Sequence, residues 1–217
     1  MSAPAVATSI TSIDTPCVVV DLDVAERNIR RLQDYLDEHG IQNRPHIKTH
    51  KLPLLAHWQV AAGACGITVQ SIGEAEVMAG AGLTDILITY NVMGEEKVRR
   101  LAQVARMARV RVAVDNEVAL EAVAAAALLA ERPIGVLVEF ESGKLRQGVV
   151  TPEEAAELAQ VAAGRPYVEF LGLLTYPSSE RVPGFVTRTR ELLAEVGIDV
   201  KVVSVGGTPG MWRTHLT

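Results

Sequence analysis

Strand-like and helix-like segments alternate along most of the chain, and this alternation limits the possible folds more than any other feature. The strand-like runs are rich in β-branched and apolar residues, and we expect strands at 43–48, 65–70, 85–89, 110–114, 134–140, 169–175 and 201–205. Helices are expected between them, at 52–62, 73–79, 95–108, 117–129, 152–163 and 185–196. Strands that alternate with helices of this length predict a parallel sheet built of strand–helix units.

The segment ahead of these units predicts one more strand and a long helix. Residues 15–20 are β-branched and strand-like, and Asp21 is placed to cap an amphipathic helix that runs to about His39 and stops at Gly40. Residues 1–14 are small and polar, without the basic start and apolar centre of a signal peptide, so we expect a flexible lead-in. Residues 15–217 are then the folded domain.

Two arrangements suit this alternation: a doubly wound open sheet and a (β/α)₈ barrel. No Gly-x-Gly-x-x-Gly follows the first strand, which removes the main signal for a dinucleotide-binding sheet. Polar side chains follow nearly every strand, which is typical of a barrel whose active site gathers at the carboxyl ends of its strands. These side chains are Lys48, Gln70, Asn91, Asp115, Arg146, Tyr176 and the turn Gly206-Gly207-Thr208. Only seven core strands are found where a barrel closes with eight, so we expect a barrel without its eighth strand, in a chain that is part of a longer protein.

Composition excludes several classes of partner. The formal net charge is -5 and no long basic run occurs, so binding to nucleic acid or to an anionic membrane has no electrostatic support. No apolar run is long enough to span a bilayer. Cys17 and Cys65 do not have the spacing of metal ligands, which favours a reducing compartment over disulfides or structural zinc. We expect a cytoplasmic protein.

The octapeptide at residues 44–51, Arg-Pro-His-Ile-Lys-Thr-His-Lys, carries the strongest chemical signal. If it is a strand, His46, Lys48 and His50 share one face, because side chains alternate along a strand. A lysine at the end of a buried strand loses part of its affinity for the proton, and its neutral amine is then a nucleophile suited to Schiff-base chemistry with a carbonyl, above all with pyridoxal phosphate. The alternative is that Lys48 and Lys51 are solvated loop charges.

A glycine-rich turn follows the last strand, with Ser204 ahead of Gly206, Gly207 and Thr208. Backbone N–H groups exposed by glycines, together with a threonine hydroxyl, form a cradle for a phosphate monoester. The position after the seventh strand is the usual phosphate site of such barrels. An ordinary Gly-Pro turn is the alternative.

Three further side chains at strand ends are candidates for contact with the cofactor. Arg146 has a permanently charged guanidinium that can donate to the pyridine nitrogen, unless it forms an ion pair with Glu139 or Glu141. Tyr176 can hydrogen-bond the cofactor phosphate or ring hydroxyl, or simply pack. Gln70 offers a neutral amide to line the ring.

Taken together and in order, these motifs resemble the alanine-racemase-like N-terminal domain of D-threonine aldolases and D-serine dehydratases. The likeness runs from about Thr15 to Trp212. The segments that carry it are residues 15–23 with Asn28, residues 44–51, residues 73–76, the loop at 142–148 and the turn at 204–208.

The resemblance implies a fold-type III pyridoxal phosphate enzyme, in which the barrel is followed by a C-terminal β-domain, absent here, in a protein that is usually a homodimer. It gives Lys48 the Schiff-base role and places His46 near that lysine as a second catalytic candidate. The implied cofactor contacts are Arg146 at the pyridine nitrogen, Tyr176, and Gly206, Gly207 and Thr208 at the phosphate. A divalent metal ion is implied for the full-length protein, with its ligands in the C-terminal domain and none in this chain.

The function expected on this basis is a lyase acting on small D-3-hydroxy amino acids, first of all by retro-aldol cleavage to glycine and an aldehyde, as in D-threonine aldolases. Dehydration of D-serine or 3-hydroxyaspartate and amino-acid racemisation are alternatives that use the same lysine and phosphate turn. A non-catalytic protein that binds pyridoxal phosphate for homeostasis is a further alternative.

Overall fold

Parallel strands form the centre of the molecule in a computed structural model that describes residues 9–216, and six strands occur in that part of the chain. Neighbours along the chain are also neighbours in the sheet, so each strand is joined to the next by a crossover. The strands are β1 (Ile67–Val69), β2 (Asp85–Ile88), β3 (Arg109–Val114), β4 (Ile134–Glu139), β5 (Val168–Leu174) and β6 (Val202–Ser204). The first eight residues, which include most of the expected lead-in, lie outside the described residues.

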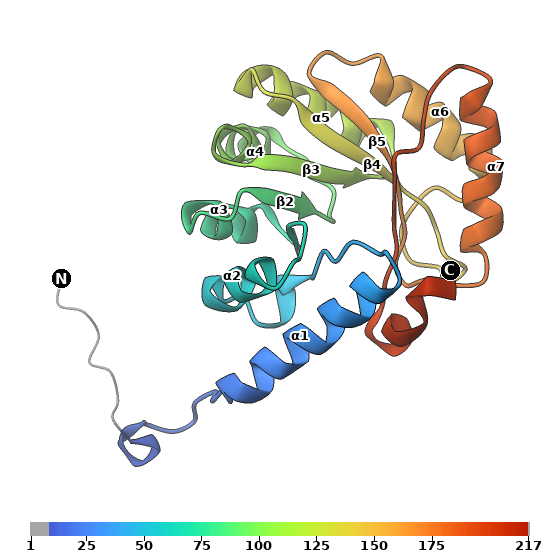
Figure 1. Ribbon diagram of the computed structural model, residues 1–217. Coiled ribbons are helices and arrows are strands. Elements are labelled where there is room, and N and C mark those ends of the chain that lie inside the picture. The colour runs from blue at the N-terminus through green and yellow to red at the C-terminus, as the bar shows by residue number, and fades with distance from the viewer. Residues whose placement is uncertain (1–8, 217) are drawn as a thin grey trace.

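Apart from the first, the helices cover the outer side of the fan that the strands form (Figure 1). They are α1 (Leu22–Glu38), α2 (Pro53–Ala61), α3 (Ile72–Gly80), α4 (Glu95–Met107), α5 (Glu117–Ala130), α6 (Pro152–Ala163) and α7 (Val182–Ala194). The described residues also contain three 3₁₀ helices: η1 (Ile10–Ser12), η2 (Ile47–Thr49) and η3 (Thr208–Leu216). The sheet does not close on itself, which confirms the prediction of an incomplete α/β barrel.

Alternation along each strand separates two apolar regions. Ile86 and Ile88 of β2 belong to the large core between the sheet and the helices, whereas Leu87 between them belongs to a small cluster on the other face. That small cluster also contains Ala113, Leu137 and Leu174. Because successive side chains of a strand point to opposite faces, a single run of apolar residues supplies both layers.

Two predicted strands are wrong. Residues 15–20 form no strand, and Val18 is 94% exposed. A β-branched composition suits a sheet, but a strand needs a partner with free backbone groups, and this segment has none within the described residues. The strand expected at 43–48 is reduced to a single bridge between His46 and Thr68, and the chain then turns into η2.

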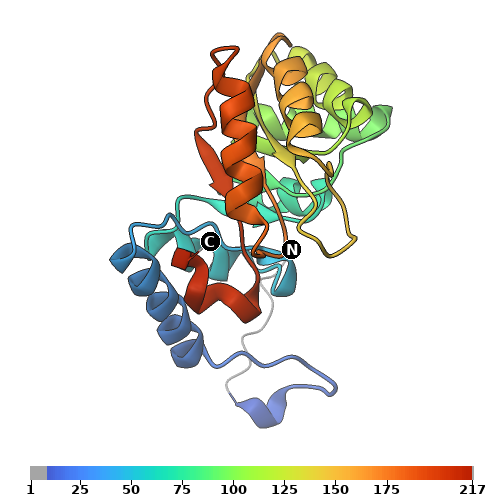
Figure 2. The ribbon, with the colours of Figure 1, turned by 90° about the vertical axis from the view of Figure 1, so that its right-hand side faces the viewer.

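Helix α1 and the terminal helix η3 lie side by side at one end of the molecule (Figure 2). Asp21 caps the start of α1, as predicted, and its carboxylate accepts a hydrogen bond from the N–H of Val24. Near its other end, Tyr35 Oη lies 2.6 Å from His215 Nδ1 and the Tyr35 ring packs edge-on against Trp212. These contacts fix η3, and with it the turn that precedes Thr208.

None of the helices in residues 9–216 combines the length and the apolar character required to cross a membrane.

Candidate active site

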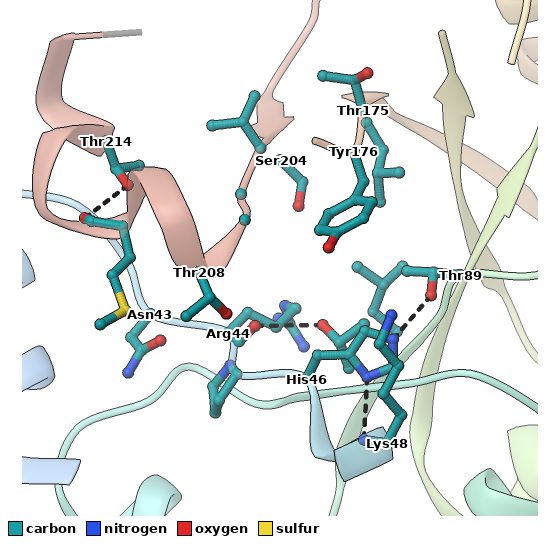
Figure 3. A pocket seen from close by; sticks show the side chains of 18 of the residues that line it. Asn43, Arg44, His46, Lys48, Thr89, Thr175, Tyr176, Ser204, Thr208 and Thr214 are labelled. Atoms are coloured by element: carbon teal, nitrogen blue, oxygen red, sulfur yellow. Dashed lines mark hydrogen bonds between the residues drawn. The ribbon is translucent and has the colours of Figure 1, made fainter. Parts of the chain in front are cut away.

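A cavity of about 410 Å³ opens among the carboxyl ends of the strands, between the sheet and the first and last segments of the described chain. Figure 3 shows side chains that line it, from the start of the domain, from the strand ends and from η3. The residues named from the sequence as catalytic or cofactor-binding candidates line this cavity: His46, Lys48, Gln70, Arg146, Tyr176, Ser204, Gly206, Gly207 and Thr208. His46 and Thr208, 162 positions apart, are thus brought to one cavity by the parallel strand order.

Lys48 is placed by a helical turn and not by a strand. It lies in η2, where Ile47 is fully buried and anchors the turn. The Lys48 Nζ atom lies 5.2 Å from the centre of the Tyr176 ring. Lys48 forms no ion pair with any residue in 9–216, whereas the Nζ of Lys51 lies 2.9 Å from a carboxylate oxygen of Glu74. The Lys48 amine therefore faces the cavity without a counter-charge bound to it.

The expectation that three nitrogen bases share one face is wrong for His50. Its ring does not line the cavity, and its Nδ1 instead accepts a hydrogen bond from the N–H of Leu52. The reason is the 3₁₀ geometry, in which three residues complete a turn, so that positions two apart no longer point the same way as they do in a strand.

His46 is held in a defined orientation beside the lysine. Its Nδ1 accepts a hydrogen bond of 3.3 Å from the Lys48 N–H, and its Nε2 lies 3.4 Å from the hydroxyl of Thr89. With Nδ1 accepting, the neutral ring carries its proton on Nε2 and donates it to Thr89. Burial of the imidazole, followed by the positive charge of Lys48, lowers the pKa of His46 to about 4. The ring is therefore neutral at physiological pH.

This pKa predicts a pH dependence of stability. Between about pH 6.5 and pH 4 the unfolded chain binds a proton at His46 that the folded chain does not, so the contribution of His46 to stability is complete above pH 6.5 and is lost as the pH falls. We expect the loss of unfolding free energy from pH 7 to pH 5 to be smaller in His46→Asn than in the wild type, by on the order of 1 kcal/mol because the imidazole is partly hydrated. Urea unfolding at the two pH values measures it, and equal losses in the two proteins would contradict the role of burial.

The opposite side of the cavity is formed by Tyr176 and by the loop after β4. The Tyr176 ring lies between Ser204 and Lys48 (Figure 3), and the guanidinium carbon of Arg146 is 4.9 Å from its centre. Glu141 does not pair with Arg146, since its carboxylate accepts hydrogen bonds from the N–H groups of Gly143 and Leu145 at 2.7 Å each. The ion pair of Glu141 is formed with Arg181, at 3.4 Å.

The glycine-rich turn presents unused backbone donors to the cavity. The carbonyl of Gly206 accepts a hydrogen bond from the N–H of Ser178, but the N–H groups of Gly206 and Gly207 have no acceptor within the described part of the chain. Gly207 adopts φ +141°, which favours glycine, and a Cβ on Gly206 would meet no atom within 4 Å. The space next to this turn is therefore open, and its donors are free to bind an anion.

The balance of charge also suits an anion. Lys48 and Arg146 line the cavity without an ion pair in the described chain, Arg44 lines it with its guanidinium paired to Asp85 at 2.6 Å, and among residues 9–216 Glu139 is the acidic side chain that lines it. An unpaired amine near one wall and free amide donors at another match the aldehyde and the phosphate of pyridoxal phosphate. The residues present fit that cofactor.

Sequence reasoning missed several lining residues and misplaced two. Thr89 follows β2 and Thr175 follows β5, so the rule that selected the other strand-end residues would have found both, whereas Asn43 carries no comparable signal. Asn91 and Asp115 follow strands but do not line the cavity. The Asn91 amide donates to Asp115, and the other oxygen of Asp115 accepts from the Gly148 N–H, so these side chains hold the Arg146 loop.

Residues 9–216 contain no group of three or more histidine, cysteine, aspartate or glutamate side chains arranged to hold a metal ion. The metal expected from the resemblance, with ligands elsewhere in a longer protein, stays a prediction.

Comparison with known proteins identifies relatives over nearly the whole chain. The family model for the alanine racemase N-terminal domain matches residues 20–216. A D-threonine aldolase from an Arthrobacter species is 42% identical over 184 residues, which cover 85% of this chain and 48% of that protein. The D-threo-3-hydroxyaspartate dehydratase of Delftia sp. strain HT23 is 33% identical over 219 residues, which cover 93% of this chain and 57% of that protein. The crystal structure of D-threonine aldolase from Filomicrobium marinum superimposes with a TM-score of 0.89 at 32% identity, over 95% of this chain and 60% of that one. The chain thus spans about half the length of the curated relatives that it matches.

Proposed function

The chain belongs to the family of the alanine racemase N-terminal domain, and from this premise we propose that it is the cofactor-binding part of a pyridoxal phosphate-dependent lyase that acts on D-3-hydroxy amino acids. One observation carries the proposal: the amine of Lys48, free of any ion pair in the described chain, shares a cavity with the free amide donors of Gly206 and Gly207. The names of the relatives support the substrate class, since both act on D-amino acids with a hydroxyl on the third carbon.

Each end of the cofactor has residues suited to hold it. Lys48 would bind the aldehyde carbon, and Gly206, Gly207 and the hydroxyls of Ser204 and Thr208 would bind the phosphate. Arg146, Tyr176 and Gln70 would bind the ring. Pyridoxal phosphate, when bound, supplies an aldehyde that condenses with amines and a ring that withdraws electrons from the substrate carbon next to the nitrogen.

The residues of the chain contribute binding, orientation and control of protons. Arg146 donates hydrogen bonds but cannot accept a proton, so in contact with the pyridine nitrogen of the cofactor it would leave that nitrogen unprotonated and would weaken the withdrawal of electrons by the ring. His46 is neutral, and its Nε2 proton is shared with Thr89. His46 therefore places a neutral hydrogen-bonding group, not a second positive charge, next to Lys48.

We propose aldol cleavage to glycine and an aldehyde as the reaction, because the aldolase relative is 42% identical and the dehydratase relative 33%. Dehydration to a keto acid and ammonia is the second candidate, supported by the match to the dehydratase over 93% of the chain.

The test is an assay of the whole protein, loaded with pyridoxal phosphate, on D-threonine, D-serine and D-3-hydroxyaspartate, with and without a divalent metal ion. We expect glycine and an aldehyde from D-threonine, and none from L-threonine, which is the matched control. A keto acid with ammonia would establish the dehydratase, inversion of the substrate the racemase, and a bound cofactor without turnover the homeostasis protein. Residues 9–216 contain no group of three or more side chains arranged to hold a metal ion. If metal removal abolishes turnover, we therefore expect ligands outside these residues.

We further propose a homodimer in the reducing interior of the cell. The dimer follows from the family resemblance, and the compartment is supported by Cys17 and Cys65, which are both free thiols. Size measurement with and without a reducing agent tests both statements.

A further inference from the structure

Glu139, the last residue of β4, is the acidic side chain that lines the cavity within residues 9–216, and it is only 5% exposed. Burial of a carboxylate costs free energy unless its charge is compensated. In this cavity the cost is greater, because a negative charge repels the anion that the glycine turn is suited to bind. A task for Glu139 is therefore expected.

The loop after β4 is fixed so that it returns to Glu139. Gly148 adopts φ +114°, and a Cβ at this position would lie 2.4 Å from the carbonyl carbon of Phe140, so only glycine allows the return. The Gly148 N–H donates to Asp115, and the Val149 N–H donates to the Glu139 carbonyl at 2.9 Å. The loop is thus anchored directly after the two residues, Arg146 and Gln147, that line the cavity.

Glu139 is hydrogen-bonded to Gln147, and Arg146 is the preceding residue of the same loop. The amide Nε2 of Gln147 donates a hydrogen bond of 2.6 Å to Glu139 Oε2. The pKa of Glu139 is raised to about 7: burial is the main cause and the charge of Asp115 adds to it, while the Gln147 hydrogen bond and the positive charge of Arg146 oppose the rise. The interaction is mutual, so an ionised Glu139 also attracts the Arg146 guanidinium.

Arg146 has little else to hold it. It forms no ion pair with any described residue, Glu139 included, and its neighbour Leu145 is 95% exposed. The contact that directs its guanidinium inward is the Tyr176 ring, 4.9 Å away. A long, flexible side chain at the rim of a cavity would otherwise extend into water.

We propose that Glu139 is a positioning residue: through the hydrogen bond from Gln147 its carboxylate holds the loop that carries Arg146, so that the Arg146 guanidinium stays turned into the cavity, where Arg146 contacts the cofactor ring. This role depends on the cofactor-binding function proposed above. Glu139 itself does not contact the reacting atoms, so its removal should act through Arg146.

The experiment is a double-mutant cycle on the whole protein loaded with pyridoxal phosphate, with Glu139→Gln, Arg146→Lys and the double variant. The readout is the visible absorption band of the bound cofactor and the pH at which it changes. We expect Glu139→Gln to move that pH by about one unit, because the charge next to the ring is displaced. In the Arg146→Lys background, Glu139→Gln should cause no further shift in the pH at which the absorption band changes. Glu139→Asp, which keeps the charge, should restore most of the wild-type behaviour.

Glu169→Gln is the matched control, since Glu169 is an exposed carboxylate paired with Lys201 on the same sheet. It should leave the band and its pH dependence unchanged. A Glu139→Gln protein with a wild-type band, or equal shifts in the two backgrounds, would overturn the positioning role. A wild-type protein with neither a band nor a covalently trapped cofactor would overturn the cofactor-binding function itself, so the two failures are distinguishable.

Discussion

Replacement of Lys48 by alanine is expected to abolish covalent trapping of pyridoxal phosphate by borohydride and to lower turnover by a factor on the order of 10⁴. Lys48 lies in the cavity, unpaired within the described chain, with its Nζ 5.2 Å from the Tyr176 ring. Borohydride reduces the bond between an amine and the cofactor aldehyde, so the mass of the labelled peptide reports which lysine has reacted. In the wild type, the label should be found on the peptide that contains Lys48.

Lys51 provides the matched control for this experiment. It is only three positions away, but it is paired with Glu74 at 2.9 Å and lies outside the set of residues that line the cavity. Lys51→Ala should therefore keep both the trapped cofactor and most of the turnover. Label found on Lys51, or on Lys144 in the loop after β4, would overturn the assignment of Lys48.

Replacement of Gly172 by alanine should have the largest effect on folding. Gly172 lies in β5 at φ +151°, and a Cβ there would come within 1.9 Å of the Val202 carbonyl oxygen in β6. It directly follows a register shift in the pairing of β4 with β5, where Leu171 is the extra residue. The obstacle is the backbone of Val202, which cannot move aside as a flexible side chain could. We therefore expect a loss of about 4 kcal/mol or more in unfolding free energy, measured by urea unfolding.

Gly184→Ala is the control for that experiment. Gly184 is in the first turn of α7, without a positive φ, and a Cβ there meets no atom within 4 Å. Alanine favours the helix and restricts the unfolded chain, so we expect a gain of about 0.5–1 kcal/mol. Equal effects of the two substitutions would show that the close approach of β5 and β6 does not constrain the fold.

Much of the fold could be predicted because its signals are local. The helix expected at 152–163 has the same first and last residues in the structure. Thr151 caps its start in a capping box with Glu154. The strand at residues 15–20 could not be judged locally. Its composition is correct for a strand, yet pairing depends on a partner that the described chain does not contain.

Several residues of the site could be predicted from their position at the end of a strand, but the way their side chains are arranged could not be predicted. Lys48, Arg146 and Tyr176 were found because each follows a strand or an expected strand, and in a parallel barrel such residues meet. The 3₁₀ turn at Lys48 separates it from His50, and the Glu139 carboxylate emerges as part of the site only when Gln147 returns to it. Both depend on how a loop packs against residues distant in sequence.

The amino-acid sequence by itself determined the succession of strands and helices, their parallel order, and the choice of the lysine and the glycine turn, which line the same cavity. Periodicity, capping and strand-end position act over a few residues, which explains why they can be read directly from the chain. Only the tertiary structure decided which charges are paired and which are free, because an ion pair or an unused donor depends on every group that packs around it. For that reason the neutral state of His46, the lone amine of Lys48 and the burial of Glu139 became visible only in the folded molecule.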